Sequence, residues 1–213
     1  MIKNFLVLLV ISVSFLFFSC GEKKTESPLD ELKDKAKDME NLGNQMKELS
    51  EGVTEGKKVN PVDFRELKSL LPENVGSFNR TNIEGEKVNA MGMNISHADA
   101  NYSDQDGAQS IDLKITDLGS VSGLSGLAAY GWYMVDIDKE NESGYEKTFT
   151  YKGNKGYEKY DNQGKYGELS VLVAKRFIIE ANGNSVSMDQ IKAAVDAIYI
   201  GKLESWKDFG VEE

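Results

Sequence analysis

The clearest pattern along the chain is an alternation of apolar and polar residues with a period of two. Ile111, Leu113 and Ile115 alternate with polar neighbours, which is typical of a strand with one buried face. Polar, glycine-containing stretches such as 103–107 separate neighbouring runs and predict short turns, so the strands are expected to pair antiparallel. Comparable runs predict further strands at residues 78–84, 95–102, 145–151, 155–161, 167–174 and 177–181.

A period of three to four residues marks the helices. The run Asn60-Pro61-Val62-Asp63 offers a cap, a proline and an acid where a helix starts, and Pro72 ends that helix. Residues 124–135 predict a helix of about three turns. A last helix begins at Ser187, three residues before Gln190, which is the spacing of a capping box. Its expected inner stripe is Met188, Ile191, Ala194, Val195 and Ile198.

Together these elements predict an α+β fold: an antiparallel sheet of about six to seven strands with helices packed on it, preceded by a helical spacer. The single domain is expected over residues 59–206. Leu203 and Trp206 are expected to pack against the domain, and residues 207–213 are expected to be frayed.

The spacer is predicted between residues 20 and 58. Ser27-Pro28 is a helix start, and apolar residues then recur in steps of three and four from Leu29 to Leu49, with charged residues on the other faces. Such a segment would hold the domain away from a membrane. A weak self-associating coiled coil remains an alternative, because Ala36 and Gly43 lie within or beside the apolar stripe.

The N-terminal residues predict where in the cell the protein is located. Lys3 precedes an apolar run from Phe5 to Phe18, which is shorter than the roughly 20 residues that a membrane-spanning helix needs. Residues 1–19 are therefore interpreted as a signal peptide. An ordinary secretory signal and a single-span anchor are the alternatives.

The junction Ser19-Cys20-Gly21 resembles a bacterial lipobox, although Phe17 and Phe18 depart from the usual residues before it. The resemblance implies cleavage before Cys20, a diacylglycerol thioether on its sulfur and a fatty acyl group such as palmitate on its amine. Two or more chains anchor a protein stably to a bilayer. We therefore expect a lipoprotein of the cell envelope, on the outer membrane and facing the periplasm or the cell surface.

The amino-acid composition argues against several classes of function. Among 213 residues, 25 are Lys or Arg and 35 are Asp or Glu, a net charge of −10, which argues against nucleic acid as a partner. The single histidine, His97, lies beside Ser96 and Asp99, but alternation in a strand places Ser96 and His97 on opposite faces. Asp104-x-Asp106 lacks the remaining ligands of a calcium loop. We predict no catalytic residues, no metal site and no cofactor.

Aromatic residues supply the candidate binding face. Tyrosines crowd between residues 145 and 166, together with Phe149. Packing within the sheet is one explanation, since tyrosine favours strands. An exposed platform for a protein, glycan or small-molecule partner is the other. The candidate residues are Tyr145, Tyr151, Tyr157, Tyr160 and Tyr166.

Several segments resemble uncharacterised Gram-negative envelope lipoproteins. These segments are Leu71-Pro72-Glu73 with Gly76 and Arg80, then 111–119, 168–173 and 177–180. The order of strands and helices is also similar to the Mog1/PsbP-type sandwich. The resemblance implies a location and a shape, and it supplies no catalytic motif.

Three hypotheses follow for function. The first is a non-catalytic, lipid-anchored envelope protein that binds a ligand or partner through its sheet. The second is a hydrolase of envelope polymers that uses paired carboxylates, which the many acidic residues leave open. The third is a structural or assembly factor that acts through the helix predicted near residues 27–51.

Overall fold

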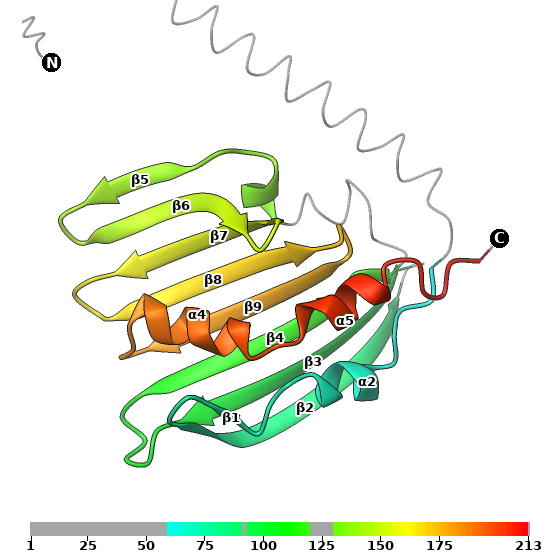
Figure 1. Ribbon diagram of the computed structural model, residues 1–213, viewed down its shortest axis with the longest axis horizontal. Helices are drawn as coiled ribbons and strands as arrows, with labels where there is room; N and C mark the ends of the chain where they lie inside the picture. The colour runs from blue at the N-terminus through cyan, green and yellow to red at the C-terminus, as the bar shows by residue number, and fades with distance from the viewer. Residues whose placement is uncertain (1–58, 91–92, 120–129, 213) are drawn as a thin grey trace, which may run out of the picture. The chain divides into compact units, whose positions relative to one another are not determined.

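The computed structural model describes residues 59–90, 93–119 and 130–212 (Figure 1). The predicted signal peptide, Cys20, the predicted spacer and most of the predicted helix 124–135 lie outside these residues. The elements, in chain order, are α2 (Phe64–Ser69), β1 (Asn74–Val75), β2 (Phe78–Ala90), β3 (Met93–Ser103), β4 (Ser110–Asp117), the 3-10 helix η2 (Gly131–Tyr133), β5 (Asp138–Asn141), β6 (Gly144–Tyr151), β7 (Asn154–Asp161), β8 (Tyr166–Val173), β9 (Phe177–Asn184), α4 (Met188–Asp196) and α5 (Ile200–Ser205).

The nine strands of the described residues form one antiparallel sheet in the order β1-β2-β3-β4-β9-β8-β7-β6-β5. Strands β1 to β4 form one meander, β5 to β9 form a second, and the pairing of β4 with β9 joins them (Figure 1). The protein is therefore mostly β, and the predicted antiparallel sheet with helices packed on it is confirmed.

The predicted number of strands, six to seven, is too low. The two additional strands are the edge strands β1 and β5. β1 has two residues, and the four residues of β5, Asp-Lys-Glu-Asn, are all exposed. β1 buries Val75 but is too short to show an alternating pattern, and β5 buries no apolar side chain, so neither is marked in the sequence.

Helices α2, α4 and α5 lie on one face of the sheet, which we call the helix side (Figure 1). Helix α2 packs on β2 and β3, α4 packs on β4, β8 and β9, and α5 contacts β8. The main core fills the space between. Its largest fully buried apolar side chains are Tyr102, Phe177, Leu67, Ile111, Leu113, Ile115, Leu169, Ile179, Ile191 and Leu203.

Helix α4 starts as its sequence predicts. The Ser187 hydroxyl accepts a hydrogen bond from the Gln190 N–H, and the Gln190 side chain accepts one from the Ser187 N–H. This reciprocal capping box supplies partners for free groups of the first turn. All five residues of the predicted stripe are buried: Met188, Ile191, Ala194, Val195 and Ile198.

The first helix begins later than predicted. Asp63, rather than Asn60, is its cap, and the Asp63 carboxylate accepts a hydrogen bond from the Arg65 N–H. Residues 130–135 contain only the 3-10 helix η2, so the described end of the predicted helix 124–135 is not α-helical. Leu203 is fully buried and Trp206 packs against the core, as expected, but the short helix α5 was not predicted.

Residues 207–213 are predicted to be frayed, but the structure holds the tail in place up to Glu212. Val211 forms a β-bridge with Val59, and the Asn60 N–H donates to the Gly210 carbonyl at 2.8 Å. The side-chain amide of Asn60 donates to Glu212 at 2.8 Å. The two ends of the described domain are therefore hydrogen-bonded to each other.

A buried ion pair joins the seam between the two meanders to both ends of the domain. Asp117, the last residue of β4, is 0% exposed, and Arg176, in the turn between β8 and β9, is 3% exposed. The guanidinium donates to both carboxylate oxygens at 2.8 Å. The same carboxylate accepts from the N–H groups of Val62 and Gly119, at 2.8 and 2.9 Å.

The third nitrogen of the guanidinium holds the C-terminal tail. Nη1 of Arg176 donates to the carbonyls of Trp206, Lys207 and Phe209, at 3.0, 3.1 and 2.6 Å. One side chain thus satisfies three backbone acceptors and one buried carboxylate. Among the described helices, none is long and apolar enough to cross a membrane.

Replacing Arg176 should destabilise the whole domain. We expect Arg176→Met to lower the free energy of unfolding by about 3–5 kcal/mol, because the buried Asp117 carboxylate then lacks its counterion. Urea denaturation at pH 7 measures this difference. The neighbouring Lys175 is exposed, so Lys175→Met should change stability by less than about 0.5 kcal/mol. A similar small effect for both variants would contradict the role assigned to the pair.

Candidate functional site

The five candidate tyrosines do not lie on one face. Strand alternation and the pairing of β6 with β7 place Tyr145, Tyr151 and Tyr160 on the helix side. Tyr157 and Tyr166 lie on the opposite face, where Tyr157 pairs with Ser170 and Tyr166 pairs with Asn184. The predicted binding face is therefore divided between the two sides of the sheet.

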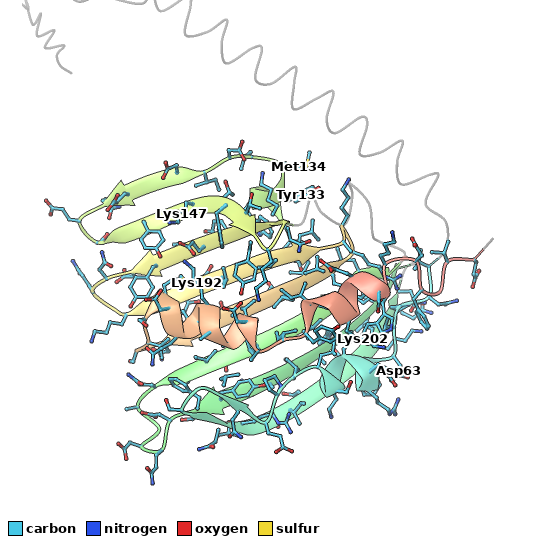
Figure 2. All side chains as sticks on the ribbon, in the orientation of Figure 1. Asp63, Tyr133, Met134, Lys147, Lys192 and Lys202 are labelled. Atoms are coloured by element: carbon cyan, nitrogen blue, oxygen red, sulfur yellow. The ribbon has the colours of Figure 1, made fainter. Side chains whose placement is uncertain are left out.

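The helix-side group forms a ledge beside α4. On the helix side, none of α2, α4 and α5 covers β5, β6 or β7, which extend beyond α4 (Figure 1). Figure 2 shows Lys147 on β6 and Lys192 on α4, on the same side of the sheet. We call this surface the ledge and define it by Tyr145, Lys147, Phe149, Tyr151, Tyr160 and Lys192.

Aromatic pairs organise the ledge. The rings of Tyr145 and Tyr160, which face each other across the strands, have centroids 6.3 Å apart. Those of Phe149 and Tyr151 meet edge to face at 6.1 Å. Gly156 lies opposite Phe149, and a Cβ there would come within 3.0 Å of the phenyl ring, so the glycine lets the ring lie flat on β7.

Two tyrosine hydroxyls fix the ledge to its surroundings. The Tyr151 hydroxyl donates to Asp196 on α4 at 2.6 Å, and the Tyr160 hydroxyl donates to the Val186 carbonyl at 2.8 Å. Lys152 also pairs with Asp196. These bonds connect β6 and β7 to α4 and to the segment just before it, so the rings have fixed orientations.

A buried carboxylate lies beneath the rings. The Glu158 side chain is 0% exposed, and it has Lys147 Nζ at 3.1 Å and Lys192 Nζ at 2.7 Å. Burial raises the pKa of Glu158, but the two ammonium groups lower it by more, so the net pKa lies below its usual range. Burial and the adjacent Glu158 carboxylate raise the pKa of Tyr145 to about 12. Glu158 is thus charged and Tyr145 neutral at physiological pH.

The two lysines also lie over aromatic rings. Lys147 Nζ is 5.0 Å from the centroid of Tyr145, and Lys192 Nζ is 5.6 Å from that of Phe149. Both side chains remain partly exposed, at 44% and 33%. The ledge therefore presents ring surfaces next to ammonium groups that can still reach a ligand.

The opposite face has its own aromatic cluster, which sequence reasoning missed. Trp132 of η2 stacks on Tyr157 at 6.0 Å and meets Tyr133 edge to face at 6.4 Å. These rings lie on or beside a small apolar cluster of Leu118, Leu172 and Ile178. The ring of Tyr157 therefore packs against Trp132 of its own chain.

One acidic residue on this opposite face, Glu180, has a shifted pKa. Burial raises the pKa of Glu180, and the charge of Glu168 raises it further, whereas Lys114 opposes the shift. Tyr130, whose pKa burial and Glu180 raise to about 12, lies near the same carboxylate. Glu168 also accepts a hydrogen bond from the exposed Tyr166 hydroxyl at 3.0 Å.

The remaining candidates for chemistry do not form a catalytic group. Ser96 is fully buried on the helix side, whereas His97 lies on the opposite face, 3.6 Å from Glu86 and 3.8 Å from Asp99. Within the described ranges, no group of three or more His, Cys, Asp or Glu residues is arranged to hold a metal ion. The ledge is accordingly suited to binding by contact, through rings and charges.

Comparison of the chain with family models, with curated proteins and with solved structures finds no match.

Glu158 should change the pH dependence of stability in a defined direction. Because its pKa is lowered on folding, its ionised form stabilises the folded state above the ordinary carboxyl pKa of 4.5, and this contribution is lost as pH falls through the folded-state value. Glu158→Gln should therefore cost stability at pH 7, and the cost should shrink on acidification. Thermal unfolding from pH 3 to 7 measures the difference.

Replacing both lysines tests the same cluster, because it removes the two counterions of Glu158. Lys147→Met with Lys192→Met should cost about 3 kcal/mol at pH 7, because Glu158 stays buried without a counterion. In that background Glu158→Gln should be stabilising at pH 7. The exposed pair Lys139→Met and Lys207→Met serves as a charge-matched control. If Glu158→Gln costs the same with and without the lysines, the three groups are not coupled.

Proposed function

We propose that the protein is a lipid-anchored cell-envelope protein whose sheet domain is a non-catalytic module that binds a ligand or a partner. The observation that supports this proposal most is the ledge. Its half-buried rings lie on strands that none of α2, α4 and α5 covers on this side of the sheet, and its lysines stay within reach of solvent (Figure 1). Aromatic rings of this kind are enriched where proteins bind ligands and other proteins.

The chemistry of the ledge favours a ligand with a flat apolar or sugar surface next to an anionic group. Rings such as Phe149 and Tyr151 offer contact area at a small cost in side-chain entropy. Lys147 and Lys192 could pair with an anion of the ligand while they keep Glu158 neutralised. A protein, a glycan and a small molecule can each carry both features.

The location in the cell envelope is proposed from the sequence. The signal-like residues 1–19 and the junction at Cys20 support export and lipidation, with the outer membrane as the expected site, and nothing in the acidic composition favours nucleic acid. A lipid at Cys20 would hold the domain near a membrane on which its ligands are concentrated.

The other two hypotheses have less support. A carboxylate-dependent hydrolase would have to use a pair such as Glu168 and Glu180, of which Glu180 has the raised pKa that suits a general acid. That pair lies on the face opposite the ledge, so a ligand found there would favour this second function. The proposed assembly role through the N-terminal helix concerns residues outside the described ranges.

Lipidation is tested by metabolic labelling with a fatty-acid probe. The wild-type chain should incorporate the label, and Cys20→Ala should not, since Cys20 is the one cysteine in the sequence. Membrane fractionation of both forms gives a second readout. Label that survives in Cys20→Ala would show that the anchor is elsewhere.

Binding at the ledge is tested by photo-crosslinking in intact cells. A photoreactive phenylalanine analogue in place of Tyr145 should form a defined adduct, because this ring would contact the ligand. The matched control places the analogue at Tyr199, which is 71% exposed and not part of the ledge. Lys147→Ala should weaken the Tyr145 adduct severalfold, about the effect of one charged hydrogen bond. The same adduct from both positions, or no adduct from position 145, would exclude the ledge as the binding site.

A further inference from the structure

The long strand β2 has an open outer edge. It contains 13 residues, from Phe78 to Ala90, but β1 pairs only with Phe78 and Asn79. Within the described residues, no strand lies on the outer side of β2 from Thr81 to Ala90 (Figure 1). Alternate residues of an edge strand direct their N–H and C=O groups outward, so this stretch can accept a further strand.

The two edges of the sheet differ in how they are protected. β5 at the far edge has only four residues, all exposed, and a very short edge strand is a common way to discourage pairing. β2 has no proline, and its register is interrupted only between Arg80 and Asn82, at one end of the open stretch. Its remaining residues continue a regular ladder with β3 up to Ala90.

Acidic side chains line one face of this open edge. Glu84 and Glu86 point to the face opposite the helices, and Asp99 of β3 lies directly beside Glu84. Together with Gly85 and His97, they line a hollow of about 270 Å³. His97 lies 3.6 Å from Glu86 and 3.8 Å from Asp99, and Lys114 of β4 lies directly beside Asp99. A cationic side chain placed here would meet several carboxylates.

The helix-side face of the same edge is apolar and small at Ile83 and Gly85, and it carries the exposed Lys87 further along. Phe64 of α2 covers Gly85, since a Cβ at that position would lie 3.0 Å from its ring. Ile83, two residues earlier on the same face, packs against the main core. An added strand would therefore find small and apolar surface beside Ile83 and Gly85, one lysine at position 87 on the same side, and negative charge on the other side.

Self-pairing centred on residues 84 to 86 is disfavoured by the same carboxylates. Two copies of β2 paired antiparallel around a two-fold axis at Gly85 would place Glu84 opposite Glu86 twice. An axis at Glu84 or at Glu86 would place that glutamate opposite its own copy. Like charges directly opposite each other destabilise a sheet, so the open edge fits an occupant of the opposite charge.

We infer that the outer edge of β2, from Thr81 to Ala90, binds an extended peptide segment that carries Lys or Arg at alternate positions and adds a tenth strand to the sheet. Backbone hydrogen bonds hold the segment, and its basic side chains pair with Glu84, Glu86 and Asp99. The ledge plays no part in this site, which stands whether or not the ledge binds a ligand.

The test uses the full chain in detergent and a fluorescent peptide of alternating Lys and Thr, with anisotropy as the readout. Glu84→Gln with Glu86→Gln should weaken binding about tenfold, since the variant loses two exposed ion pairs with the peptide. Glu140→Gln with Glu142→Gln, on and next to the opposite edge strand, removes the same charge and should leave binding unchanged. Equal effects of the two double variants would overturn the proposal.

Backbone pairing is tested on the peptide, without change to the protein. N-methylation of every second residue blocks hydrogen bonding along one edge of the peptide only. Methylation in one of the two alternating patterns should abolish binding, and methylation in the other should preserve it. Equal binding of both methylated peptides would show that charge alone attracts them. A dimer of the wild-type chain that the peptide cannot dissociate would assign the edge to a second copy and contradict the inference.

Discussion

The buried pair of Asp117 and Arg176 is the interaction on which the rest of the domain depends. It lies where β4, the last strand of the first meander, pairs with β9 of the second. The Asp117 carboxylate holds Val62 near the start of the domain, and the Arg176 guanidinium holds three carbonyls near its end. Because both charges are buried, each is costly without the other. The pair therefore couples the seam of the sheet to both ends of the domain.

A second constraint is the size of the sheet relative to its helices. Nine strands are paired in one layer, and the short helices α2, α4 and α5 cover β2, β3, β4, β8 and β9. Strands β5 to β7 extend beyond this cover and cannot bury a full apolar face. They carry tyrosines instead, which pack their rings and keep their hydroxyls hydrogen-bonded, and a buried Glu158 neutralised by two lysines. The proposed binding surface follows from this incomplete cover.

Sequence periodicity predicted the elements with strong patterns. The alternation of Ile111, Leu113 and Ile115 in β4 and the capping box at Ser187 are local signals, and both were confirmed. β1, β5 and α5 have no such signal, because they are short or exposed. The choice of Asp63 over Asn60 as a cap depends on where the chain meets the sheet, which the sequence does not state.

The candidate site was harder to predict than the fold. Within β7, alternation alone separates Tyr157 from Tyr160, but the grouping of Tyr160 with Tyr145 depends on the register between β6 and β7. Glu158 shares the inward face of Tyr160, and a charge at an inward position is a signal that could have been noticed. Its partner Lys192 comes from α4, distant in sequence, so only the folded structure identifies the cluster. The resemblance to envelope lipoproteins and to the sandwich fold stays a prediction.

The central claim is that the ledge contacts a ligand or partner in the envelope. Hydroxyl-radical footprinting of the full chain, in intact envelopes and in purified detergent-solubilised form, tests it most directly. The account predicts that Tyr145 and Tyr151 are labelled less in the envelope, whereas the exposed Tyr199 and Tyr166 are labelled equally in both preparations. Equal labelling of the ledge in both, or protection confined to the face of Tyr157 and Tyr166, would contradict it.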